Sequence, residues 1–145
     1  MRRPLLATTL ISGLLLAGAG PASAATRAFD VWTSKDLTEG RAHTYGSVDF
    51  VTPYRVTVSG RLNDVCPADG HGAYLRVTFV LDNGNTRQLS AKDTTTCSNA
   101  DGVDVWLTQD VSSTRRITAV KLYLYEYDAQ RNSTADDVVK TIKAP

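Results

Sequence analysis

Residues 75–85 read LRVTFVLDNGN. Every second residue from Leu75 to Leu81 is large and apolar. Because successive side chains of a strand point to opposite faces, this alternation predicts a strand with one apolar face. The Asn83-Gly84 pair that follows is the strongest short signal for a β-hairpin, in which both central residues take positive φ. Residues 86–92 are then predicted to be the returning strand.

The same alternation recurs along the chain and predicts about seven strands in all. After position 24, Thr, Val and Ile make up 32 of 121 residues, and these β-branched side chains fit the pleated surface of a sheet. The apolar faces of three further strands carry Tyr54, Val56, Val58 and Leu62; Val103, Val105 and Leu107; and Val120, Leu122 and Leu124. Val48 and Phe50 belong to an earlier strand, and Val138, Val139 and Ile142 belong to a short final strand.

The fold class follows from these short strands and from the polar, glycine-containing clusters that separate them. Since most strands have one apolar face, two antiparallel sheets packed face to face would bury those faces, as in an immunoglobulin-like or jelly-roll-like sandwich. Residues 25–40 are expected to be a loosely held lead-in, with one turn of helix at 34–39. The chain is therefore predicted to be all-β, with a single antiparallel β-sandwich domain at residues 25–145.

The first 24 residues have the pattern of a secretory signal peptide. A basic start at Met1-Arg2-Arg3 precedes an apolar run, and Ala22-Ser23-Ala24 is a small-residue cleavage site. We expect a secreted, extracellular protein with no membrane attachment after cleavage, because no second apolar stretch approaches the roughly 20 residues of a membrane span. The remaining chain has fourteen basic and fifteen acidic residues, a balance that argues against nucleic acid as a partner.

The chain has two cysteines, Cys66 and Cys97. An even number of cysteines in an oxidising compartment favours a disulfide over metal binding or catalysis. Neither cysteine lies in a C-x-x-C pair or beside a basic cluster that would make its thiol reactive. We therefore predict one disulfide between them, which would stabilise the fold by roughly 3 to 4 kcal/mol.

Several features follow one another along the chain. They are the Ala-Ser-Ala cleavage site, a strand ending VSGRLND at residues 58–64, an Asp69-Gly70 turn, an AYLRV strand at 73–77, and the second cysteine in the next loop. Together they resemble the small exported β-sandwich proteins common in actinobacteria. The resemblance spans roughly residues 56–107; it implies the sandwich fold and export, and it implies no particular activity.

An acidic cluster is expected beside the predicted disulfide. If the two cysteines pair, the loop with Asp64 and Asp69 meets the loop with Asp101 and Asp104, and both loops also contain asparagine. Carboxylate and amide oxygens are the ligands that Ca²⁺ takes, so these four aspartates are a candidate structural calcium site. Asp and Asn are also ordinary turn residues, and the sequence leaves both interpretations open.

Five aromatic residues form the candidate ligand-binding surface. Three of them, Tyr123, Tyr125 and Tyr127, lie with Lys121 on the face opposite the aliphatic one of the same strand, and Tyr74 and Trp106 are also turned away from aliphatic faces. Exposed aromatic surfaces bind sugars and proteins. The alternative is that the tyrosines form cross-strand pairs covered by residues 25–40 or by a loop.

No catalytic residue is predicted. The two histidines, His43 and His71, lie in no metal-binding spacing, and the chain has no nucleophile elbow and no phosphate-binding glycine loop. No cofactor is expected apart from the structural calcium.

The sequence therefore predicts a secreted, non-catalytic binding module, with extracellular or cell-wall carbohydrate as its ligand. The alternative is a secreted protease inhibitor or another protein-binding domain, because residues 93–100 form a polar loop that a disulfide would brace.

Overall fold

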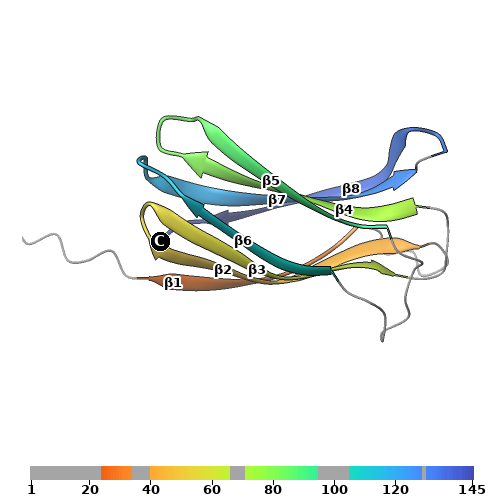
Figure 1. The fold of residues 1–145 in the computed structure, drawn as a ribbon, viewed down its shortest axis with the longest axis horizontal. Coiled ribbons are helices and arrows are strands. Elements are labelled where there is room, and N and C mark those ends of the chain that lie inside the picture. The colour runs from red at the N-terminus through yellow and green to blue at the C-terminus, as the bar shows by residue number, and fades with distance from the viewer. Residues whose placement is uncertain (1–23, 34–39, 66–70, 95–104, 129) are drawn as a thin grey trace, which may run out of the picture.

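The structure, a computed structural model, describes residues 24–33, 40–65, 71–94, 105–128 and 130–145, and these form eight strands in two layers (Figure 1). One sheet has the order β1-β2-β3-β6 and the other the order β5-β4-β7-β8, with every neighbouring pair antiparallel. The predicted all-β sandwich is confirmed. The strands are β1 (Ala25–Trp32), β2 (Arg41–Thr52), β3 (Arg55–Val65), β4 (His71–Leu81), β5 (Thr86–Asp93), β6 (Val105–Ser112), β7 (Ile117–Asp128) and β8 (Ser133–Lys143).

The prediction of seven strands missed β1. Residues 25–32 were expected to be a loose lead-in, but they pair with β2 along their whole length, from Ala25 opposite Phe50 to Trp32 opposite His43. Phe29 and Val31 of β1 are both buried, at 5% exposure each. Two apolar residues in alternation are a weak local signal, and they became a strand because β2 offers them a sheet edge and a core. The helical turn expected at 34–39 lies outside the described residues.

The last strand is also longer than predicted. β8 has 11 residues, of which only Ile142 is buried. It lies at the edge of its sheet, where exposed polar side chains are tolerated and the apolar alternation is interrupted. The sequence pattern therefore predicted a strand shorter than the one observed.

The chain crosses between the sheets three times. β1, β2 and β3 are consecutive neighbours, β4 and β5 form a hairpin in the second sheet, β6 returns to pair with β3, and β7 and β8 complete the second sheet. In a constant-type immunoglobulin domain the third strand already belongs to the second sheet. Here β3 stays beside β2, and β4 is the first strand to cross.

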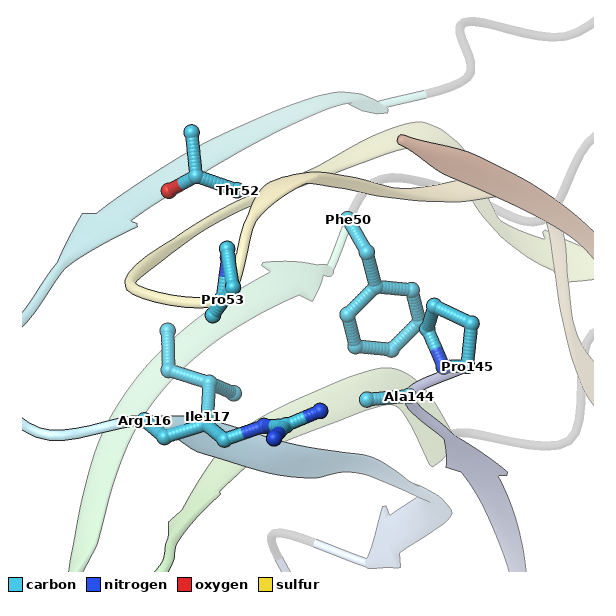
Figure 2. A pocket seen from close by; sticks show the side chains of 7 residues that line it. All are labelled: Phe50, Thr52, Pro53, Arg116, Ile117, Ala144 and Pro145. Atoms are coloured by element: carbon cyan, nitrogen blue, oxygen red, sulfur yellow. The ribbon is translucent and has the colours of Figure 1, made fainter. Parts of the chain in front are cut away.

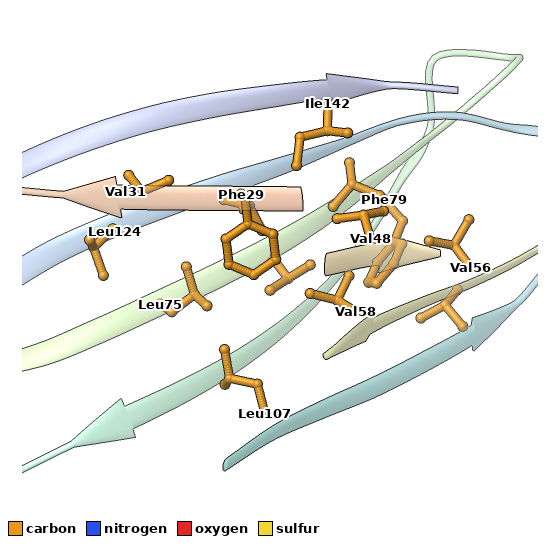
Figure 3. Close-up of a cluster of buried hydrophobic side chains, with 14 of the residues drawn as sticks. Phe29, Val31, Val48, Val56, Val58, Leu75, Phe79, Leu107, Leu124 and Ile142 are labelled. Carbon is orange, nitrogen blue, oxygen red and sulfur yellow. The ribbon is translucent and has the colours of Figure 1, made fainter. Parts of the chain in front are cut away.

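The hydrophobic core lies between the two sheets (Figure 3). Alternate residues of each central strand point inward, which matches the predicted apolar faces of β3, β4 and β7. Tyr54 is an exception, since it lies in the turn before β3 and is 51% exposed. The fully buried core side chains include Val48, Val56, Val58, Leu62, Leu75, Val77, Phe79, Ile117, Val120, Leu122 and Leu124.

Two glycines face each other at the centre of the first sheet. Gly46 of β2 is paired with Gly60 of β3, between Phe29 of β1 and Leu107 of β6. A Cβ atom on Gly46 would lie 2.0 Å from the carbonyl oxygen of Ser59, far inside van der Waals contact. The two backbones approach so closely at this pair that no side chain fits.

The hairpin between β4 and β5 lies where the sequence predicts it. Its turn differs in detail, because Gly84 has φ 82° while Asn83 does not have positive φ. The amide of Gly84 donates to the Leu81 carbonyl at 3.0 Å, and the Asn83 side chain accepts from the Asn85 amide at 3.1 Å. The loop is therefore a four-residue turn, and not the two-residue type with two positive φ angles.

Candidate functional site

Four tyrosines lie together on the outer face of the β5-β4-β7-β8 sheet. Tyr74 comes from β4, and Tyr123, Tyr125 and Tyr127 come from β7, where they alternate with buried residues. Each is half-buried. This tyrosine face, defined by these four residues, exists because period-two alternation turns every second side chain of β7 away from the core.

The four rings contact one another. Tyr74 lies directly opposite Tyr125, and their rings are stacked with centroids 5.3 Å apart and planes 18° apart. Tyr123 stacks on Tyr125 at 5.0 Å, and Tyr127 meets Tyr74 edge to face at 5.6 Å. At these separations nearly parallel rings overlap with an offset, so part of each ring face is covered by its neighbour. The surface offered to a ligand consists mainly of ring edges and hydroxyl groups.

Charged and polar side chains flank the rings in register. The row through Tyr74 and Tyr125 continues to Lys92 on β5 and to Asp137 on β8. In the next row the guanidinium of Arg76 lies 5.7 Å from the centroid of the Tyr123 ring. The tyrosine rings are thus bordered by two cations, Lys92 and Arg76, and by the carboxylate of Asp137.

Tyr123 has an altered ionisation. Burial raises its pKa above the ordinary tyrosine value, and the charge of Asp137 together with a hydrogen bond to that carboxylate raises it further, while Arg76 opposes the shift. Its neutral hydroxyl is therefore favoured as a hydrogen-bond donor.

An open depression lies beside the rings. It is lined by Tyr74, Tyr125, Ser90, Ala91 and Lys92, and its volume is about 410 Å³. Ring carbons form its apolar side, while the Ser90 hydroxyl and the Lys92 ammonium supply polar groups. Such a mixture of apolar surface and a few polar groups can bind a ligand that has both kinds of surface.

The structure separates Trp106 from the other four predicted binding residues. Trp106 lies on β6, opposite Arg61 of β3, and therefore in the other sheet. The proposal that residues 25–40 cover the tyrosines fails for residues 25–32, since β1 also belongs to that other sheet.

Of the four candidate calcium ligands, Asp64 alone belongs to the described residues. Asp69, Asp101 and Asp104 lie outside them, as do Cys66 and Cys97 of the predicted disulfide. Asp64 is 7% exposed, and its amide donates to Oδ2 of Asp93 at 3.1 Å. Within the described ranges no group of three or more His, Cys, Asp or Glu side chains is arranged to hold a metal ion.

A second aromatic cluster was not predicted. Trp32 of β1 and His43 of β2 lie opposite each other with stacked rings, centroids 3.5 Å and planes 9° apart. Tyr45 stacks on His43 at 4.9 Å, and the guanidinium carbon of Arg41 lies 4.3 Å from the Trp32 ring centroid. We call Trp32, Arg41, His43 and Tyr45 the tryptophan cluster. The sequence did offer one signal, because Arg41, His43 and Tyr45 are alternate residues and so share one face of a strand. That signal indicates a cluster with Trp32 only if β1 is recognised as the neighbouring strand.

A small apolar cavity lies at the end of the sandwich where the chain ends (Figure 2). Phe50, Ile117, Ala144 and Pro145 are among the residues that line it, and its volume is about 20 Å³. A cavity of this size holds about one water molecule, so it is no ligand site.

In the parts of the chain that the structure describes, no helix has the length and hydropathy needed to cross a membrane. Comparisons of the chain with protein-family models, curated proteins and solved structures found no match.

Proposed function

We propose that this chain is an exported, non-catalytic binding module that holds an extracellular polysaccharide on its tyrosine face. The observation that carries the proposal is the contact of four tyrosine rings on one outer face, beside an open depression that contains Ser90 and Lys92. The basic start, apolar run and small-residue cleavage site of residues 1–24 support export.

The chemistry of the face suits a sugar polymer. Sugars combine apolar C–H surfaces with many hydroxyls, and tyrosine combines an apolar ring with a polar tip. Because the rings partly cover one another, a single flat sugar finds no large free ring face. An extended chain that runs along the ring edges can exchange hydrogen bonds with the tyrosine hydroxyls, Lys92 and Asp137.

The length of the tyrosine face along β7 also favours a polymer. Tyr127 and Tyr123 are four residues apart on β7, which corresponds to about 13 Å along the strand. Arg76 lies opposite Tyr123, and Lys121, two residues earlier on β7, extends the polar surface beyond it. A ligand that contacts the whole row must be longer than one sugar ring.

The proposal is tested by retention of the purified chain on insoluble polysaccharides and cell-wall preparations, with and without Ca²⁺. We expect retention by the native chain, and loss of most of it in Tyr125→Ala, because Tyr125 contacts both neighbouring rings of the row. The matched control is Tyr54→Ala, which removes an exposed tyrosine from the β2–β3 turn of the other sheet.

Thermal unfolding of both variants belongs to the same experiment, since a Tyr125→Ala chain that melts much earlier would be reporting a lost structural contact. Tyr125→Phe keeps the ring and removes the hydroxyl, so its retention shows whether the ring or the hydroxyl of Tyr125 is needed for binding. Absence of retention on every matrix would contradict the carbohydrate ligand, and stoichiometric inhibition of a secreted protease would replace it with the inhibitor function.

A further inference from the structure

The tryptophan cluster lies on the outer face of the β1-β2-β3-β6 sheet, on the side of the sandwich opposite the tyrosine face. Trp32 is 36% exposed, and it belongs to the small set of exposed large hydrophobic residues in the described part of the chain. Its ring contacts His43 on β2, and the Arg41 guanidinium lies over it. Because His43 and Arg41 both lie against this ring, the part of Trp32 that stays exposed offers a ligand mainly its edge.

The backbone that carries the cluster is hydrogen-bonded to a side chain of the other sheet. The amide of Ala42, between Arg41 and His43, donates to Oε1 of Glu126 at 2.9 Å, and the hydroxyl of Thr33, next to Trp32, donates to the same oxygen. Glu126 is 4% exposed and belongs to β7 of the other sheet. This inter-sheet anchor fixes the relative positions of Trp32 and Arg41 before any ligand arrives, which lowers the ordering cost of binding.

Among the residues that the structure describes, the charge around the cluster favours an anion. Arg41 contributes a cation, and Arg61 of β3 lies opposite Tyr45. Asp30 is the single carboxylate at this end of the outer face among the described residues, and its Oδ1 lies 2.9 Å from Nε2 of His43. A guanidinium that lies over an aromatic ring keeps its in-plane N–H groups for a second partner, and their fork matches a carboxylate.

We propose that the tryptophan cluster is a second binding site, which recognises the carboxylate-bearing sugars of an acidic polysaccharide. Trp32 contacts the sugar ring, and Arg41 donates hydrogen bonds to its carboxylate. The site is independent of the tyrosine face, because the two lie on opposite outer faces and share no residue.

The probe is polygalacturonate, a polysaccharide with one carboxylate on each sugar. Isothermal titration of the native chain gives the affinity. A Trp106→Phe chain leaves Trp32 as its one tryptophan, so that its emission reports contact at the cluster. We expect saturable binding and a change in Trp32 emission. Fully methyl-esterified polygalacturonate, which has the same sugars without charge, and polyglutamate, which has the charge without sugars, should each bind at least about tenfold more weakly.

Three variants locate the site. Trp32→Ala and Arg41→Gln should each weaken polygalacturonate binding by about tenfold, the effect expected of one lost charged hydrogen bond or ring contact. Arg27→Gln is the matched control for Arg41→Gln. It also removes one guanidinium charge, but from an exposed position on β1 away from the cluster. Tyr125→Ala tests the other face and should leave this affinity unchanged.

Equal affinity for polyglutamate, or equal losses in Arg41→Gln and Arg27→Gln, would overturn the site, because binding would then follow charge alone. Native binding that only Tyr125→Ala abolishes would overturn it as well and assign the ligand to the tyrosine face. The two sites are tested separately. Loss of retention on neutral polysaccharides in Tyr125→Ala reports on the tyrosine face, and polygalacturonate binding that persists in the same variant reports on the tryptophan cluster.

Discussion

Tyr123 shows how neighbours on one sheet face change the chemistry of a single residue. Burial and Asp137 hold its pKa above the ordinary tyrosine value of about 10. The folded state therefore binds the phenolic proton more tightly than the unfolded state does. The resulting contribution to stability is complete below the ordinary pKa, and it is lost as the pH rises through the raised pKa.

At the residue scale, Asp137→Asn should lower the pKa of Tyr123, because the substitution removes a negative charge and a charged hydrogen-bond acceptor. Burial remains, so part of the elevation should persist. The pKa is measured by an NMR titration of the chain with ring-labelled tyrosine. Asp136→Asn is the control, since Asp136 is paired with Glu126 one position along β8. An equal fall in both variants would show that the effect is general and not due to the Asp137 contact.

At the scale of the elements, the β2–β3 pair depends on its two opposed glycines. Their Cα hydrogens occupy the space that side chains fill elsewhere in the sheet, and a Cβ on Gly60 would lie 2.1 Å from the carbonyl oxygen of Tyr45. The strands that carry His43, Tyr45 and Arg61 are therefore held closer at this point than other residues would allow. The pair contributes to the geometry of the tryptophan cluster by positioning the strands beneath it.

Gly46→Ala should destabilise the fold by about 2 to 3 kcal/mol, since the new methyl group overlaps backbone that cannot move without disturbing the ladder. Urea denaturation followed by circular dichroism measures the loss. Gly84→Ala provides the comparison, because its Cβ meets open space and only its φ of 82° is unfavourable, at a cost of about 1 kcal/mol. If Gly84→Ala is as costly as Gly46→Ala, steric overlap is not the cause.

At the scale of the whole molecule, the strand ends that lead to the two cysteines lie next to each other. The hydrogen bond from the Asp64 amide to Asp93 joins β3 and β5, two residues before Cys66 and four residues before Cys97. An extended chain covers about 3.4 Å per residue, so both cysteines are within reach of a common point. The disulfide itself stays a prediction, since both cysteines lie outside the described residues.

We expect reduction to lower the free energy of unfolding by roughly 3 to 4 kcal/mol, because the cross-link restricts the unfolded chain. Thermal unfolding with and without reductant measures the change, and the Cys66→Ser, Cys97→Ser double variant should match the reduced native chain. Two free thiols in the unreduced, unfolded protein would contradict the disulfide.

The local part of the structure was predictable. Alternation between Leu75 and Leu81 identified β4 and its core face, and the same reasoning turned Tyr123, Tyr125 and Tyr127 outward on β7. These inferences held because side-chain direction in a strand depends only on the backbone of that strand. β1 was missed because its pattern is too short to be distinguished from a loop without its partner β2.

The sequence by itself determined the central strands and which of their side chains face the core, but it did not identify β1 or the full length of β8. The tertiary structure decided which strands share a sheet, and therefore that Tyr74 joins the tyrosines of β7 while Trp106 lies on the opposite sheet. It also decided that Trp32, Arg41 and His43 meet across β1 and β2. Strand order results from pairing between distant segments competing for one shared core, and local alternation holds no information about that competition.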